Sequence, residues 1–200
     1  MPTPQGIGKV IGLQTLKQRV VLYIEGVGMA DFEEYLWNRH AEERNAQIAK
    51  INPQMPDGGS GLATADARAY LAGLSSDKRK AYESLAAKID AITARNRQVL
   101  VDSGLEKAET VAAWEGAYKH YVPLQREDVE TGGNGTGQGF SVRGTSSKRA
   151  VGSGRPVADI IANLAMQRER FIVKAEKNRV SIAIAGLAAS NPNPDFWKLN

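Results

Sequence analysis

The sequence predicts an all-α protein, a bundle of five or six helices with one long Gly-rich basic loop or small hairpin. Apolar residues recur at three- and four-residue spacing through most of the chain, which is the period of an amphipathic helix. Aromatic residues make up only 6% of the chain and alanine is abundant, a composition that suits closely packed helices. Between the periodic segments lie glycines and prolines, which end or bend helices.

Six segments carry the helical pattern. The first, over residues 6–23, places Val10, Leu13, Leu16 and Val20 on one face. The other helices are predicted over residues 30–51, 64–71, 78–101, 106–118 and 156–189. Several residues at their ends have the types that begin or end helices. Thr64 and one of Ser75, Ser76 and Asp77 are expected as N-caps, Gly104 as a C-terminal glycine and Pro156 as a first-turn residue.

Three segments are predicted to lie outside the helices. Residues 121–124 read as extended, because Val122 precedes a proline, and we expect this strip to lie across the helices. Residues 131–155 form a flexible Gly-rich basic insertion, with at most a small hairpin near residues 139–143, and residues 191–200 form a tail. The whole chain of 200 residues reads as a single helical module, excised from a longer polypeptide because it opens without a recognisable domain start.

Composition excludes several classes of site. The chain has no cysteine, so disulfides, zinc-thiolate sites, iron–sulfur clusters and thiol nucleophiles are excluded. Its only two histidines, His40 and His120, are far apart in sequence, so we predict no metal site and no cofactor. Apolar runs are too short to cross a bilayer, and no membrane span is expected. The net charge of +4 is compatible with an anionic partner but does not require one.

The Gly-rich stretch "TGGNGTGQGFSVRGTSSKRAVGSGRP" contains four cations and no acidic residue. It lacks the Gly-Lys-Ser/Thr ending of a phosphate-binding P-loop, and no predicted strand precedes it as a dinucleotide fingerprint would require. Two interpretations stay open, a flexible connection and a sequence-independent contact with a phosphate backbone. The candidate nucleic-acid-binding residues are Arg143, Lys148, Arg149 and Arg155.

Polar residues interrupt the apolar seams of the long helices, and we interpret them as a structural polar network that fixes helix register. Its predicted members are Arg39, His40, Glu43, Arg44, Asn45, Asn96, Arg168, Glu176, Lys177 and Asn178. The competing interpretation is an active site around His40, Glu42, Glu43, Arg44, Glu176 and Lys177. The sequence "HAEER" lacks the second histidine of a zinc-protease motif, so we favour the structural role and predict no catalytic residue. His40 is expected to be a hydrogen-bonded packing residue.

Four phrases occur together along the chain: "YLWNRHAEERNAQIAKINPQMPDGGSGL", "YVPLQ", "GFSVRGTSSKRAVGSGRPVADIIAN" and "AEKNRV". In this order they resemble a helical module of the large multidomain polyvalent proteins of tailed phages and mobile elements. Members of that class join helical modules to enzymatic domains, and some are packaged in the virion and enter the host with the DNA. The resemblance supplies no catalytic residues for this chain.

The resemblance implies a non-catalytic structural and interaction module, located in the virion, the host cytoplasm or both. The implied partners are other virion or polyvalent-protein domains and a second copy of the chain, with DNA as the alternative partner through the basic loop. Because the motif positions fall on two predicted helices, we expect a contact between the "RHAEERN" and "AEKNRV" segments, with Glu176 and Lys177 pairing with Arg39, Arg44 or Asn45.

Overall fold

The computed structural model describes residues 28–124, 159–193 and 195, and these residues form five α-helices with no strand among them. The all-α class predicted from the sequence is therefore confirmed for this part of the chain. The helices are α1 (Met29–Ile51), α2 (Thr64–Gly73), α3 (Ser76–Asp102), α4 (Ala108–Ala117) and α5 (Ile160–Ser190). The predicted helix over residues 6–23 and the predicted insertion over residues 131–155 lie outside the described residues.

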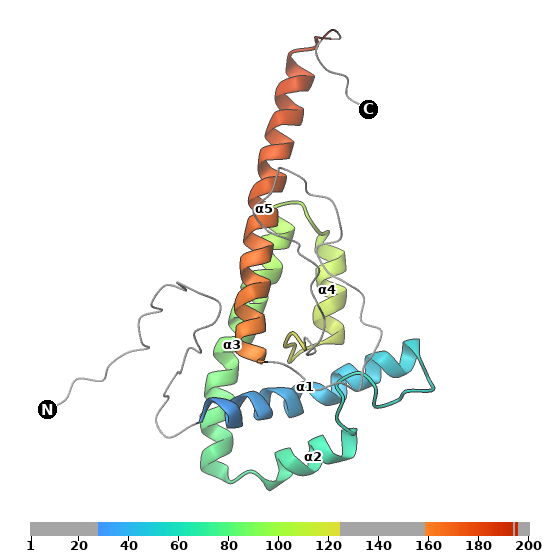
Figure 1. The fold of residues 1–200 in the computed structure, drawn as a ribbon, viewed down its shortest axis with the longest axis vertical. Helices are drawn as coiled ribbons and strands as arrows, with labels where there is room; N and C mark the ends of the chain where they lie inside the picture. The colour runs from blue at the N-terminus through green and yellow to red at the C-terminus, as the bar shows by residue number, and fades with distance from the viewer. Residues whose placement is uncertain (1–27, 125–158, 194, 196–200) are drawn as a thin grey trace, which may run out of the picture.

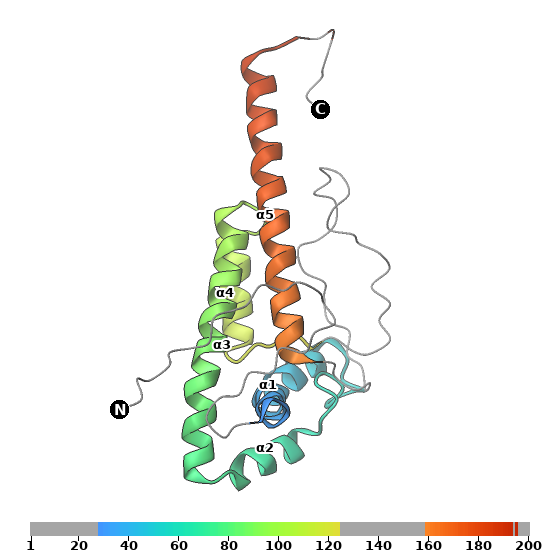
Figure 2. The ribbon, with the colours of Figure 1, turned by 60° about the vertical axis from the view of Figure 1, so that its left-hand side comes forward.

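The helices form two groups that meet near the start of α5. Helices α3, α4 and α5 run side by side along the long axis of the molecule (Figure 1). Helix α1 crosses this group near the start of α5, and α3 continues past α1 to reach α2, which packs beneath α1, as the end-on view of α1 shows (Figure 2). Helix α5 continues well past the ends of α3 and α4 in both views.

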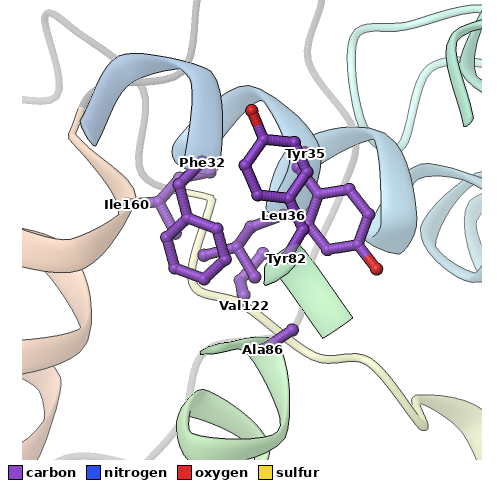
Figure 3. Close-up of a cluster of buried hydrophobic side chains, with 7 residues drawn as sticks. All are labelled: Phe32, Tyr35, Leu36, Tyr82, Ala86, Val122 and Ile160. Atoms are coloured by element: carbon purple, nitrogen blue, oxygen red, sulfur yellow. The ribbon is translucent and has the colours of Figure 1, made fainter. Parts of the chain in front are cut away.

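The main core lies where the two groups cross. It gathers buried side chains from α1, from α3, from the extended strip and from the first turn of α5 (Figure 3): Phe32, Tyr35, Leu36, Tyr82, Ala86, Val122 and Ile160. The rings of Tyr35 and Tyr82 lie 5.0 Å apart between centroids, and Phe32 lies 6.0 Å from Tyr82. Such aromatic contacts favour one arrangement of α1 on α3 beyond the gain from burial alone.

The extended strip lies across the helices, as predicted. Residues 121–124 have no helical or strand structure, and Val122 is 2% exposed within the core. Just before the strip, the backbone N–H of His120 donates to the Glu43 carboxylate at 3.0 Å. Burial of Val122 and this hydrogen bond hold the strip on α1.

The helix ends agree in part with the sequence prediction. The Ser75 hydroxyl accepts a hydrogen bond from the Lys78 N–H at 3.4 Å and begins α3, and Gly104 ends it with a positive φ of 70°. The predicted cap of α2 is wrong, because Thr64 is the first residue of the helix and its hydroxyl donates to Asp57 instead. Helix α5 begins at Ile160, where the Asp159 carboxylate accepts from the Ala162 N–H at 2.9 Å. The predicted first-turn residue, Pro156, lies outside the described residues.

Across residues 28–124 and 159–193, none of the helices combines the length and the apolar character needed to cross a membrane.

Candidate functional site

The predicted polar residues of α1 contact three different neighbours: helix α3, the loop between α1 and α2, and the segment around the extended strip. Arg39 faces α3, where its guanidinium forms two hydrogen bonds with the Asp90 carboxylate at 3.0 and 2.6 Å. Both side chains are largely shielded, with 16% and 30% of their surface exposed. A paired guanidinium and carboxylate with this geometry fixes direction as well as distance. The sequence analysis did not predict Asp90 as a member of the polar network, because its position in the helix does not indicate which residue of another helix it contacts.

Asn45 holds the loop between α1 and α2. Its side-chain oxygen accepts from the Ser60 N–H at 2.8 Å, and its amide nitrogen donates to the Leu62 carbonyl at 2.8 Å and the Thr64 hydroxyl at 3.0 Å. The Asp57 carboxylate accepts from the Thr64 hydroxyl and backbone N–H, and these hydrogen bonds lower the pKa of Asp57. The loop is therefore closed by side chains rather than by regular backbone pairing.

The glycines of this loop have a packing reason. A Cβ atom added to Gly59 would lie 2.4 Å from the backbone oxygen of Arg44, so only glycine allows the loop to approach α1 this closely. Gly61 has a φ of 84°, which other residues rarely adopt. The Trp37 indole N–H donates to the Ser60 carbonyl at 3.0 Å and closes the other side of the loop. The phrase "NPQMPDGGSGL" thus encodes a tightly packed connection.

His40 is buried in an aromatic pocket at the junction of α1 with the extended strip. The side chain is 0% exposed, and its ring lies 5.5 Å from the Tyr118 ring and 5.7 Å from the Tyr121 ring. Among the described residues neither ring nitrogen has a hydrogen-bond partner, so the predicted hydrogen-bonded role is wrong and His40 packs through its ring. The physical reason is distance, because the Glu43 carboxylate stops 3.7 Å from Nδ1.

Burial and the neighbouring charges together set the pKa of His40. Burial lowers the pKa of His40, and the nearby Arg44 and His120 act in the same direction, while Glu43 opposes them. Burial acts to raise the pKa of Glu43, but His40 and the His120 N–H outweigh it, so the carboxyl is held in its charged form. A neutral, fully buried imidazole beside an engaged carboxylate has no access to a substrate, which argues against general-base chemistry here.

Tyr121 joins this pocket to α3 and α5. Its hydroxyl accepts from the Gln167 amide at 3.0 Å, and the Arg97 guanidinium lies 5.5 Å from the ring centroid. Arg97 also lies 3.7 Å from the Glu115 carboxylate on α4. The pocket around His40 is therefore the point where α1, α3, α4, α5 and the strip meet.

The polar residues of α5 face α3, not α1. Arg168 donates to the Asn96 side-chain oxygen at 2.8 Å, and Asn178 donates to the Ser103 carbonyl at 2.7 Å. Glu176 is exposed and pairs with its neighbour Arg179 on the same helix. The predicted contact between the "RHAEERN" and "AEKNRV" segments is therefore wrong, because α1 crosses α5 at its first turn, where Glu33 accepts from the Ile161 N–H at 2.9 Å.

Two open hollows lie beside Arg39 and His120, with volumes of about 440 and 420 Å³. Their charged lining side chains have both signs: Arg39, Arg79, Lys119, Glu42, Glu43 and Glu83. Mixed charge gives neither hollow a preference for anions or cations. No group of three histidine, aspartate or glutamate side chains in residues 28–124 and 159–193 is placed to hold a metal ion.

The four candidate nucleic-acid-binding residues, Arg143, Lys148, Arg149 and Arg155, lie outside the described residues. Comparison of the whole chain with family models, with curated proteins and with solved structures found no match in any of the three.

Proposed function

We propose that this chain is a non-catalytic structural and interaction module of the kind found in the polyvalent proteins of tailed phages and mobile elements. The phrases quoted from the sequence support the class, and one structural observation supports the interaction role. That observation is the end of α5, residues 180–190, which we call the α5 arm. It projects beyond α3 and α4 and has no other helix of the described chain beside it (Figures 1 and 2).

The α5 arm exposes apolar side chains that a solitary helix in water would not favour. Val180 is 38% exposed, Ile182 and Ile184 are each 58% exposed, and Leu187 is 66% exposed. Ile182 lies seven residues, about two turns, after the buried Ala175, whereas Ile184 lies on the opposite side of the helix. A helix that is apolar on both sides is normally covered by other elements, so these exposed apolar side chains mark an interaction surface.

The bundle below the arm has the properties of a rigid support. The Arg39–Asp90 pair and the Asn45 hydrogen bonds fix α1 on α3 and on its loop. The buried pocket around His40 joins four helices. These polar groups are engaged in holding the helices together, so they support a scaffold that presents the arm and not a reaction centre.

A site-specific photo-crosslinking experiment tests the interaction role in cells that carry the parent phage or mobile element. A photo-reactive residue replaces Leu187 in the full chain, and a matched variant carries it at Glu169, which is exposed on α5 beside the bundle. We expect covalent adducts with other proteins of the element, or with a second copy, from position 187 and few from position 169. Equal labelling at both positions, or none at 187, contradicts the proposal.

The alternative function is sequence-independent binding of nucleic acid through Arg143, Lys148, Arg149 and Arg155. Only the charge pattern of the Gly-rich segment supports it, because no acidic residue lies between positions 131 and 156. The α5 arm is a separate surface with no charged side chain between residues 180 and 190, so the two functions are tested independently.

A further inference from the structure

We propose that the α5 arm pairs antiparallel with the α5 arm of a second copy of this chain. The inference rests on the interaction role proposed above and names the partner of that same surface. The contact uses one stripe of the arm, formed by Val180, Ile184 and Leu187. Their exposed fractions of 38%, 58% and 66% make them available for an interface.

The stripe faces away from the bundle. Ile184 lies nine residues after Ala175, which is two and a half helical turns, so the two side chains are on opposite sides of α5. Ala175 is 1% exposed, and Asn178 in the next turn contacts Ser103 at the end of α3. A partner that approaches the stripe therefore meets no obstruction from α3.

Charge identifies the kind of partner. No charged residue occurs from Val180 to Pro194, whereas the preceding segment, residues 168–179, contains five basic and two acidic side chains. A neutral apolar stripe offers nothing to a phosphate backbone and matches a neutral apolar helix. The arm itself is such a helix, and the small residues that flank the stripe, Ala183 and Ala188, allow a second helix to approach closely.

Charge also decides the direction. In a parallel pair, Glu176, Lys177 and Arg179 of one copy would lie beside the same residues of the other, and like charges would repel. In an antiparallel pair with its two-fold axis between Ala183 and Ile184, Val180 lies opposite Leu187. The same register places the charged turn of each copy opposite the uncharged Ser190 and Asn191, so the basic segments are at opposite ends.

The size of the stripe limits the strength of association. The stripe covers about two turns of each helix, so the dimer would bury less than the roughly 1,200 Å² of total surface that a stable dimer usually buries. We therefore expect a reversible dimer whose fraction rises with protein concentration. Sedimentation velocity of the full chain over a hundredfold range of concentration measures the dissociation constant.

Two variants that each replace an isoleucine of the arm by glutamate test whether dimerisation depends on the stripe or only on the overall hydrophobicity of the arm. Ile184→Glu places a charge at the centre of the stripe and should raise the dissociation constant at least about tenfold. Ile182 is equally exposed, at 58%, but it lies on the opposite side of the arm, in line with the side chains by which the earlier part of α5 packs on the bundle. The variant Ile182→Glu should therefore dimerise like the wild type. Because both side chains are exposed, both variants should fold, which circular dichroism checks.

Single cysteines test the direction, since the chain has none of its own. Under oxidation, Val180→Cys mixed with Leu187→Cys should form a mixed disulfide-linked dimer, while Leu187→Cys alone should form little. A wild type that stays monomeric throughout, equal weakening by both glutamate variants, or efficient self-linking of Leu187→Cys overturns the proposal. If the arm instead crosslinks in cells only to a different protein, the interaction role stands and the second copy is the wrong partner.

Discussion

The side-chain oxygen of Asn45 accepts a hydrogen bond from the backbone N–H of Ser60 at 2.8 Å, and both residues are almost fully buried. Through this contact one amide on α1 determines the path of the loop that leads to α2. The nitrogen of the Asn45 side-chain amide also donates a hydrogen bond to the carbonyl of Leu62. The connection between α1 and α2 therefore depends on the chemistry of a single side chain.

Asn45→Ala should destabilise the protein by about 2–3 kcal/mol, because it leaves the buried Ser60 N–H without its acceptor and removes one of the two donors to the Leu62 carbonyl. Denaturant unfolding followed by circular dichroism measures the change. The matched control on α1 is Glu42→Ala, which removes an exposed pair with Arg68 and should cost less than about 1 kcal/mol. Similar losses for the two variants would show that the loop is held by other contacts.

Gly59→Ala should destabilise the protein by about 1–3 kcal/mol, because the new Cβ would lie 2.4 Å from the Arg44 carbonyl oxygen and the loop must move away. Gly116→Ala in α4 is the control, since a Cβ there would meet nothing within 4 Å beyond its chain neighbours and its own helix backbone. That variant should gain about 0.5–1 kcal/mol from the higher helix propensity of alanine. Thermal unfolding of both variants compares them, and a neutral Gly59→Ala would contradict the close approach.

Glu33 should make folding less favourable as pH rises through neutrality. Burial, aided by the nearby Asp159 carboxylate, raises the pKa of Glu33 from 4.5 to about 7. The folded state binds more protons than the unfolded state between these values, so the stabilising contribution is complete below pH 4.5 and is lost as pH rises through 7. Because the side chain is only partly buried, solvent screening reduces the effect, and we expect a change on the order of 1 kcal/mol.

The variant Glu33→Gln isolates this effect, because it cannot ionise and its side-chain oxygen can still accept from the Ile161 N–H. Its stability relative to the wild type should rise between pH 4.5 and 7.5 in urea unfolding. Asp159→Asn should flatten the wild-type trend, because it removes the neighbouring negative charge. A constant difference between Glu33→Gln and the wild type across this range would show that Glu33 ionises normally.

His40 should titrate below its ordinary pKa of 6.5 in the folded protein, because burial disfavours the charged imidazolium. As pH falls below 6.5, His40 therefore becomes protonated in the unfolded state before it does in the folded state. The stability that depends on a neutral His40 is complete above pH 6.5 and is lost as pH falls toward the pKa of the folded state. The chain has two histidines, and a His120→Gln variant assigns the remaining imidazole signal in an NMR titration. A midpoint for His40 at or above 6.5 would contradict its burial in the aromatic pocket.

If the Gly-rich segment contacts phosphates, replacing Arg143, Lys148, Arg149 and Arg155 by Ala should reduce the salt dependence of DNA binding. Each lost phosphate contact lowers the slope of log K against log salt by about 0.9 for a duplex. The matched control removes the same charge from exposed positions on α3, through Lys78, Lys80, Lys88 and Arg95 to Ala. Equal slopes for the two quadruple variants, or no binding by the wild type, would exclude this segment as a nucleic-acid arm.

The sequence by itself determined the helical class and most helix positions, because both depend on local information. The spacing of apolar residues predicts α1 and α3 to within two residues of their ends, and Ser75 and Gly104 mark the limits of α3 by chemistry that acts within one turn. The extended strip follows from the restriction that Pro123 places on Val122.

Only the tertiary structure decided which polar residues meet. Arg39 pairs with Asp90 and Arg168 with Asn96, whereas the sequence predicted pairing between α1 and the middle of α5. Apolar periodicity shows which face of a helix is buried, but the crossing point of two helices depends on the packing of all side chains between them. The exposure of the α5 arm has the same origin, because α3 ends near Asn178 while the apolar pattern of α5 continues to Leu187.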